Sequence, residues 1–178
     1  MLTDNLVSFV PVGAPLSLIS GVATIASTNV VDLMGSGPGT AVNNIIGNAS
    51  QPGMDVGVGG VRPELNVTIG DAVVSGGGGT VNVMLQAAPN TDGTNLPGSW
   101  TTLAETGPIS AANLTAGQIV ARFPFLPAFP AGLNPRFLRL AFGIATAAVT
   151  AGSIASALVT NYRDDQANKY AAGNFTVA

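Results

Sequence analysis

Bulky apolar residues recur at every second position along much of this chain, and this period constrains the fold more than any other feature. Leu65, Val67 and Ile69 are separated by single polar residues, and residues 80–87 repeat the alternation. Successive side chains of a β-strand point to opposite faces, so the pattern is typical of strands that bury one face. The glycine-rich residues 75–79 lie between the two segments, which predicts a hairpin with a glycine turn.

Similar short alternating segments recur along the rest of the chain, with turn-forming residues between them. Seven strands are predicted, at residues 28–33, 65–69, 80–87, 99–105, 118–125, 136–145 and 153–161. An eighth strand, within residues 16–25, is left open. No segment has a sustained helical period, and residues 110–114 are expected to form one helical turn at most. The predicted fold class is all-β: a jelly roll or β-sandwich of seven or eight strands with extended N- and C-terminal arms.

Three segments do not fit the sandwich, which is assigned to residues 22–162. Residues 1–21 combine bulky apolar residues with two prolines, which predicts an arm that lies on another surface. Residues 34–61 are rich in glycine and too long for an ordinary connection, so we expect a functional excursion. Residues 163–178 form a polar tail with widely spaced aromatic residues.

Partner contacts are predicted on the two arms, because aromatic anchors on extended chain commonly dock onto a neighbouring protein. The predicted contact residues are Leu6 and Phe9 in the N-terminal arm and Arg163, Tyr170 and Phe175 in the tail. Trp100, the single tryptophan, is instead expected to fill the core between the sheets, with a binding role as the open alternative.

Composition excludes several functional classes. The chain has no cysteine and no histidine, which removes disulfide frameworks, zinc fingers and Ser-His-Asp catalysis. Its six basic residues are scattered and its net charge is −3, so we expect no nucleic-acid partner. No segment of the sequence matches the pattern of a phosphate-binding loop or of a calcium-binding loop. A glycosidase built from distant carboxylates is a minor alternative, and the prediction is no enzyme, no catalytic residue, no metal and no cofactor.

The low density of charge indicates a surface that other proteins cover. Charged residues make up 8% of the chain, against about 25% in an average globular protein. Burying an uncharged surface avoids the cost of desolvating ions, so such an exterior suits a chain that packs against neighbours.

Residues 140–162 form an apolar stretch long enough to span a bilayer. However, Leu138, Leu140, Phe142 and Ile144 fall on alternate positions at its start, and a turn-like sequence follows at residues 150–153. The pattern predicts two antiparallel strands rather than one helix, so we expect no membrane partner.

Several short motifs carry a resemblance to a known family. They lie at residues 27–33 (STNVVDL), 100–103 (WTTL), 116–119 (AGQI), 136–140 (RFLRL), 150–159 (TAGSIASALV) and 165–170 (DQANKY). Together they resemble the capsid decoration, or cement, proteins of tailed bacteriophages, which have a jelly-roll fold.

The resemblance implies a structural virion protein on the outer surface of an icosahedral head. Its partner would be the major capsid protein, and it would bridge neighbouring capsomers and so stabilise the shell. A homodimer or homotrimer is the natural assembly on a local symmetry axis. The alternative is a carbohydrate- or receptor-binding virion module, because jelly rolls also host lectins.

Overall fold

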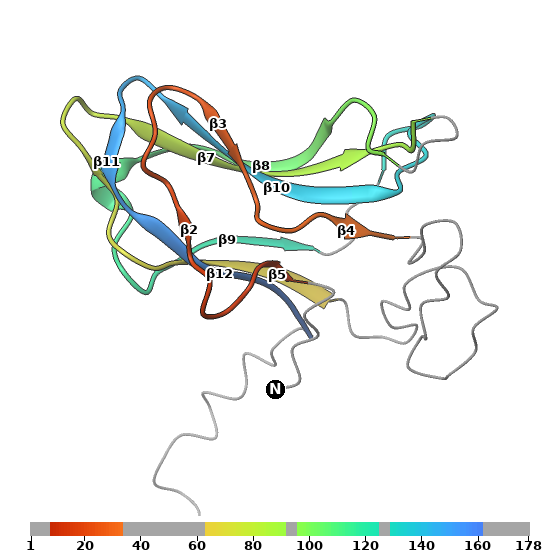
Figure 1. The fold of residues 1–178 in the computed structure, drawn as a ribbon, viewed down its shortest axis with the longest axis horizontal. Helices are drawn as coiled ribbons and strands as arrows, with labels where there is room; N and C mark the ends of the chain where they lie inside the picture. The colour runs from red at the N-terminus through yellow and green to blue at the C-terminus, as the bar shows by residue number, and fades with distance from the viewer. Residues whose placement is uncertain (1–7, 34–62, 92–95, 125–128, 162–178) are drawn as a thin grey trace, which may run out of the picture.

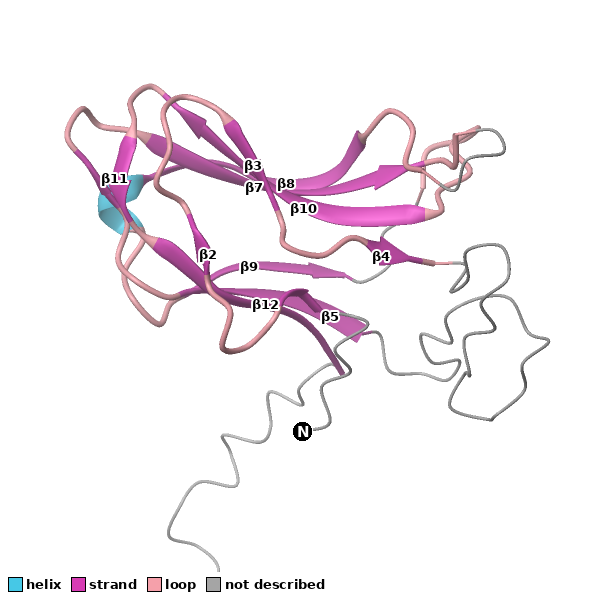
Figure 2. Cartoon of the chain, viewed as in Figure 1, coloured by secondary structure: helices cyan, strands magenta, loops and turns pink. Residues whose placement is uncertain are grey.

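The computed structural model describes residues 8–33, 63–91, 96–124 and 129–161. In these ranges the chain forms antiparallel strands that lie in two layers, with one short 3-10 turn at an end (Figures 1 and 2). The elements are β1 (Ser8–Val10), β2 (Leu16–Ser17), β3 (Thr24–Ala26), β4 (Val31–Asp32), β5 (Pro63–Ile69), β6 (Val74–Ser75), β7 (Thr80–Ala88), β8 (Thr101–Ser110), η2 (Ala111–Asn113), β9 (Ile119–Pro124), β10 (Phe137–Ala145), β11 (Val149–Ala151) and β12 (Ser153–Asn161).

The strand order is that of a jelly roll. In one sheet β1 and β2 both pair with β12, which is followed by β5 and β9. In the other, β3 and β4 both pair with β10, which is followed by β7 and β8. β1 and β2 together form one edge strand, and β3 and β4 form another. If the resulting eight strands are renumbered along the chain, with β6 and β11 left out, their order is 1-8-3-6 in the first sheet and 2-7-4-5 in the second. The predicted all-β fold class is therefore confirmed.

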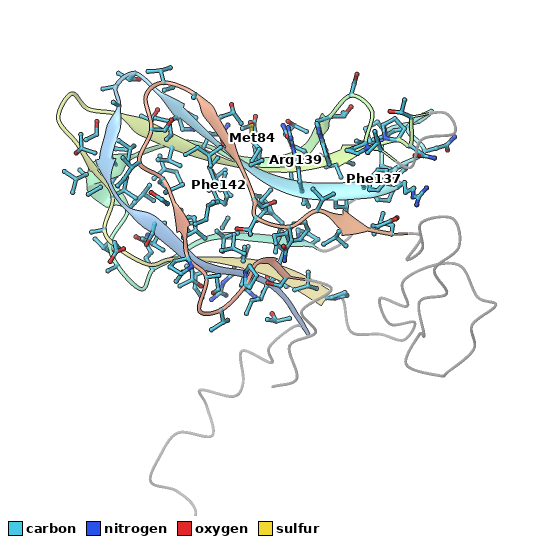
Figure 3. The ribbon with its side chains drawn as sticks, viewed as in Figure 1. Met84, Phe137, Arg139 and Phe142 are labelled. Carbon is cyan, nitrogen blue, oxygen red and sulfur yellow. The ribbon has the colours of Figure 1, made fainter. Side chains whose placement is uncertain are left out.

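The hydrophobic core lies between the two sheets and follows the predicted alternation. Along β7 the burial pattern alternates between buried and half-buried residues, and Val81, Val83 and Leu85 are buried. Phe142 of β10 pairs with Val83 and is fully buried, and Figure 3 shows its side chain between the sheets. β5 buries Leu65, Val67 and Ile69 in the same core cluster from the other sheet.

The predicted hairpin of residues 65–69 and 80–87 is wrong, although both segments are strands. β5 pairs with β12 and β9, whereas β7 pairs with β10 and β8, so the two strands belong to opposite sheets. The chain between them passes through β6, which pairs with β11 at the end of the sandwich. Alternation shows that each strand buries one face, but it does not specify the pairing partner.

Residues 140–162 contain strands, as predicted, and these strands also lie in opposite sheets. β10 belongs to the second sheet and β12 to the first, with β11 between them along the chain. Within the described ranges, no helix is long and apolar enough to cross a membrane.

Residues 1–7 of the predicted N-terminal arm (1–21) lie outside the described residues, whereas residues 8–21 are part of the sandwich. Ser8 pairs with Leu158, and β2 pairs with the start of β12. The prolines prevent one long strand, but they leave room for two strands of two or three residues at a sheet edge. The helical turn expected at 110–114 is confirmed as η2. The excursion 34–61 and the tail 163–178 lie outside the described residues.

Candidate functional site

Only one of the five predicted contact residues falls within the described ranges. Phe9 lies in β1 with 0% of its surface exposed and belongs to the core cluster. As a contact residue it is therefore a wrong prediction, because the pairing of β1 with β12 holds its side chain within the sandwich. The remaining four, Leu6, Arg163, Tyr170 and Phe175, lie outside the described residues.

Arg136 and Asp32 form an ion pair that fastens β4 to the start of β10. Arg136 Nε lies 3.1 Å from Asp32 Oδ1, and Arg136 Nη2 lies 2.9 Å from Asp32 Oδ2, which is a bidentate arrangement. The hydrogen bond to Asp32 raises the pKa of Arg136 above its ordinary value. The guanidinium also lies 5.0 Å from the ring centroid of Phe137. Because this pair joins two parts of the fold, we assign it a structural role.

A second arginine, Arg139, lies on the outer face of the same sheet. It pairs across strands with Gln86 of β7, and its Nε donates a hydrogen bond of 2.9 Å to Gln86 Oε1. The guanidinium carbon lies 4.2 Å from the ring centroid of Trp100, which directly precedes β8. Figure 3 shows Arg139 and Met84 on the side of this sheet that faces away from the core. We call the residues Asn82, Met84, Gln86, Trp100, Glu105 and Arg139 the outer platform.

The position of Trp100 differs from the sequence prediction. The expected place was the core between the sheets, but the residue is half-buried on the outer platform, outside the core cluster. Trp100 can therefore contribute to an exposed contact surface. Arg139 falls within the predicted strand at residues 136–145, but nothing in the sequence indicates its contact with Trp100.

Hydrogen bonds across the strands organise the rest of the outer platform. Asn82 Nδ2 donates to Glu105 Oε2 at 2.8 Å, and Gln86 Nε2 donates to Thr102 Oγ1 at 3.2 Å. Between these polar pairs Met84 packs over Gly143, since a Cβ built at Gly143 would lie 3.1 Å from Met84 Cε. The platform is thus a fixed polar surface with one methionine and one tryptophan.

Arg139 is a cation without a charged partner among the described residues. No carboxylate in those ranges lies within ion-pair distance, and Gln86 is its single hydrogen-bond partner there. Partial burial lowers the pKa of Arg139 below its ordinary value. An arginine remains protonated at neutral pH even so, and its two Nη groups keep their donors available.

A different surface is formed by residues 8–31, which supply β1, β2 and β3 and lead into β4 at one edge of the sandwich. We call it the N-terminal edge. It contains no charged residue. Among the described residues seven large apolar side chains are exposed, and four of them belong to this edge, namely Val12, Ile19, Val22 and Val30, with exposures from 47% to 72%. Exposed apolar residues that accompany uncharged edge strands favour contact with another protein.

The described carboxylates are spread over the fold. Asp71 Oδ2 accepts a hydrogen bond of 2.8 Å from Ser153 Oγ, while Asp32 and Glu105 have the partners given above. Within the ranges that the structure covers, no group of three or more potential metal ligands occurs. The described part of the chain therefore offers two surfaces for function, the outer platform and the N-terminal edge.

Comparison with known proteins gives one family. The model of the Bbp16 family matches residues 21–159, which is more than three quarters of the 178 residues. The matched range begins in the loop before β3 and ends in β12, so it contains most of the jelly roll. No curated protein matches the chain. The chain belongs to the Bbp16 family and is a phage-related protein.

Proposed function

We propose that the protein binds the outer surface of an icosahedral phage head, where it contacts the major capsid protein, bridges neighbouring capsomers and stabilises the shell. The observation that carries this proposal is the N-terminal edge, an uncharged border with exposed valine and isoleucine side chains. It belongs to a jelly roll of a phage-related family, which supports a place in a virion.

The apolar, uncharged composition of the N-terminal edge favours attachment to a shell of repeated protein subunits. Each apolar side chain that leaves water contributes about 25 cal/mol per Å² of buried surface. Because residues 8–31 contain no charged side chain, their burial incurs no cost for stranded ions. Contacts of this kind are weak one at a time, but a bridging protein engages several capsid subunits at once. The second contact is then intramolecular, and the overall attachment is much stronger than either contact alone.

A homodimer or homotrimer fits this role, because an oligomer presents the same surface to several subunits around a symmetry axis. Carbohydrate binding has less support. One face of Trp100 is occupied by the Arg139 guanidinium at 4.2 Å, so a sugar ring that stacked there would first have to displace it.

The test is binding to heads that lack this protein. Purified protein is mixed with such heads, and the bound fraction is measured after sedimentation. Val22→Asp, at a side chain that is 65% exposed on the N-terminal edge, should weaken binding because it would bury a charge. Ile119→Asp is the matched control: its side chain is 43% exposed on β9, at the opposite edge of the sandwich.

Failure of the wild-type protein to sediment with heads would refute the proposal. Equal loss of binding in Val22→Asp and Ile119→Asp would refute the N-terminal edge as the contact surface. Deletion of residues 163–178 tests the tail without removing any described strand. At the N-terminus, deletion of residues 1–21 is unsuitable because it removes β1 and β2. Deletion of residues 1–7 is used there instead, because it removes no described strand.

A further inference from the structure

The outer platform presents a cation whose side chain is fixed and whose charge is unpaired among the described residues. Arg139 lies against Trp100, and Gln86 holds its Nε. We propose that this platform docks a carboxylate side chain of the capsid protein, with Arg139 as the charged anchor and Trp100 as its apolar support. The inference deepens the proposed function and depends on it.

The donors that remain on Arg139 match a carboxylate. Since Nε is engaged with Gln86, the two Nη groups are left, and they form the end of the planar guanidinium fork. Two parallel N–H···O bonds from such a fork to one carboxylate are short and strong. A lysine would supply the charge but not this paired geometry.

The side chains are positioned before a partner arrives. Stacking on Trp100 and the bond to Gln86 restrict the rotamers of Arg139 in the free protein, so less conformational entropy is lost on binding. Partial burial also removes some of the water that would otherwise weaken an ion pair at a surface. Arginine and tryptophan are among the residue types that most often dominate the binding energy of interfaces.

An external carboxylate fits better than one from the described part of this chain. Asp32 is paired with Arg136, Asp71 accepts a hydrogen bond from Ser153, and Glu105 accepts one from Asn82. Each of these three acids is already hydrogen-bonded where it stands, and Glu64, the fourth acid of the described ranges, lies in β5 of the opposite sheet. The charge of Arg139 therefore complements an acidic residue on a partner.

The first experiment compares two arginines by the same change of charge. Arg139→Gln should lower the affinity for heads about ten- to hundredfold, the loss expected for a charge-assisted bidentate contact. Arg122→Gln is the matched control, because Arg122 is exposed on β9 in the other sheet. Arg122→Gln should bind as the wild type does. Equal affinities for Arg139→Gln and wild type would overturn the inference.

A second variant tests the charge without removing the arginine. Gln86→Glu places a carboxylate where Gln86 Oε1 already accepts the bond from Arg139, so it pairs the cation within the chain. This variant should fold at least as stably as the wild type and still bind heads more weakly. Unchanged affinity for heads in Gln86→Glu would also overturn the inference, and it cannot be attributed to misfolding.

The single tryptophan reports on the platform directly. Trp100 is replaced by 5-hydroxytryptophan, whose fluorescence can be excited separately from that of the tryptophans of the capsid. Acrylamide should quench this fluorescence in the free protein and quench it much less in the head-bound protein. Binding without this protection would refute the platform as a contact and leave head binding intact. Protection already present in the free protein would show that the chain or a second copy covers the platform, which also overturns the inference. Absence of any head binding by the wild type would reject both proposals.

Discussion

Replacement of Phe9 by alanine distinguishes a core residue from a partner contact. Phe9 is fully buried in β1, and its carbonyl oxygen accepts a hydrogen bond of 3.0 Å from the backbone N–H of Asn29. Transfer of its ring from water contributes about 1.5–3 kcal/mol, and the cavity left by its removal adds to this. The total loss for a buried phenylalanine is about 3–5 kcal/mol. For a chain of this length each kcal/mol lowers Tm by about 2–4 °C, so we expect a fall of about 6–20 °C.

Thermal unfolding followed by circular dichroism measures this shift. Val12→Ala is the control, since Val12 lies in the same segment with 72% of its surface exposed, and its effect on unfolding should stay within about 0.5 kcal/mol. Head binding is then measured at a temperature where both variants are folded. Phe9→Ala should bind as the wild type does, because its side chain does not reach the surface.

The opposite result would refute this reasoning. If Phe9→Ala kept the wild-type Tm and lost head binding, the side chain would have to face a partner. The sequence prediction of a contact at Phe9 would then be right, and the placement of β1 within the sandwich would be wrong.

Three further substitutions test the sandwich by urea denaturation. Gly152→Ala should cost about 2–5 kcal/mol, because the residue has φ +135° and the new Cβ would lie 2.9 Å from Val73 Cα. Gly78→Ala should lower the free energy of unfolding by about 1–2 kcal/mol, because the residue has φ +71° but no atom lies within 4 Å of the new Cβ. Equal losses in the two glycine variants would refute the clash at Gly152. Ser27→Ala should cost about 1–3 kcal/mol, because Ser27 Oγ accepts the backbone N–H of Leu140 at 3.1 Å in a buried position. A change in unfolding free energy below 0.5 kcal/mol would contradict that role.

The positions of the long strands could be predicted because their cause is local. A strand between two layers needs an apolar residue at every second position, and this requirement is visible without knowledge of the partner strand. Residues 80–87 were predicted and β7 spans Thr80–Ala88, while residues 153–161 coincide with β12. Each of these strands is long enough for the period to be recognised.

Pairing could not be predicted, because it depends on where each connection carries the chain. β5 and β7 have equivalent patterns and are joined by a glycine-rich segment that would suit a hairpin, yet the segment crosses from one sheet to the other. The short edge strands were missed for a different reason. β1 and β2 have three and two residues, too few for any period to appear, and the prolines beside them favoured an arm.

The outer platform also could not be predicted from the sequence. The outward direction of Arg139 follows from its place in β10, but its contact with Trp100 depends on the register of β8 against β7. That register shifts between Asn82 and Met84 and again between Leu85 and Gln86. Two irregularities within one strand pair therefore affect where the start of β8, and with it Trp100, lies relative to Arg139, and neither has a recognisable pattern in the sequence.

The two proposed contact surfaces are neighbours, which affects how a capsid subunit would engage them. β3 pairs with residues 141–143 of β10, and the backbone N–H of Ser27 donates to the carbonyl oxygen of Leu140, so the N-terminal edge runs beside the strand that carries Arg139. A partner surface that covers the Arg139 guanidinium would therefore lie next to β3, the part of the N-terminal edge that pairs with β10. Water excluded by the apolar part would strengthen the ion pair, since a charge interaction grows as the local dielectric falls. Thus the N-terminal edge would supply most of the buried area, and Arg139 would fix the orientation of the partner on it.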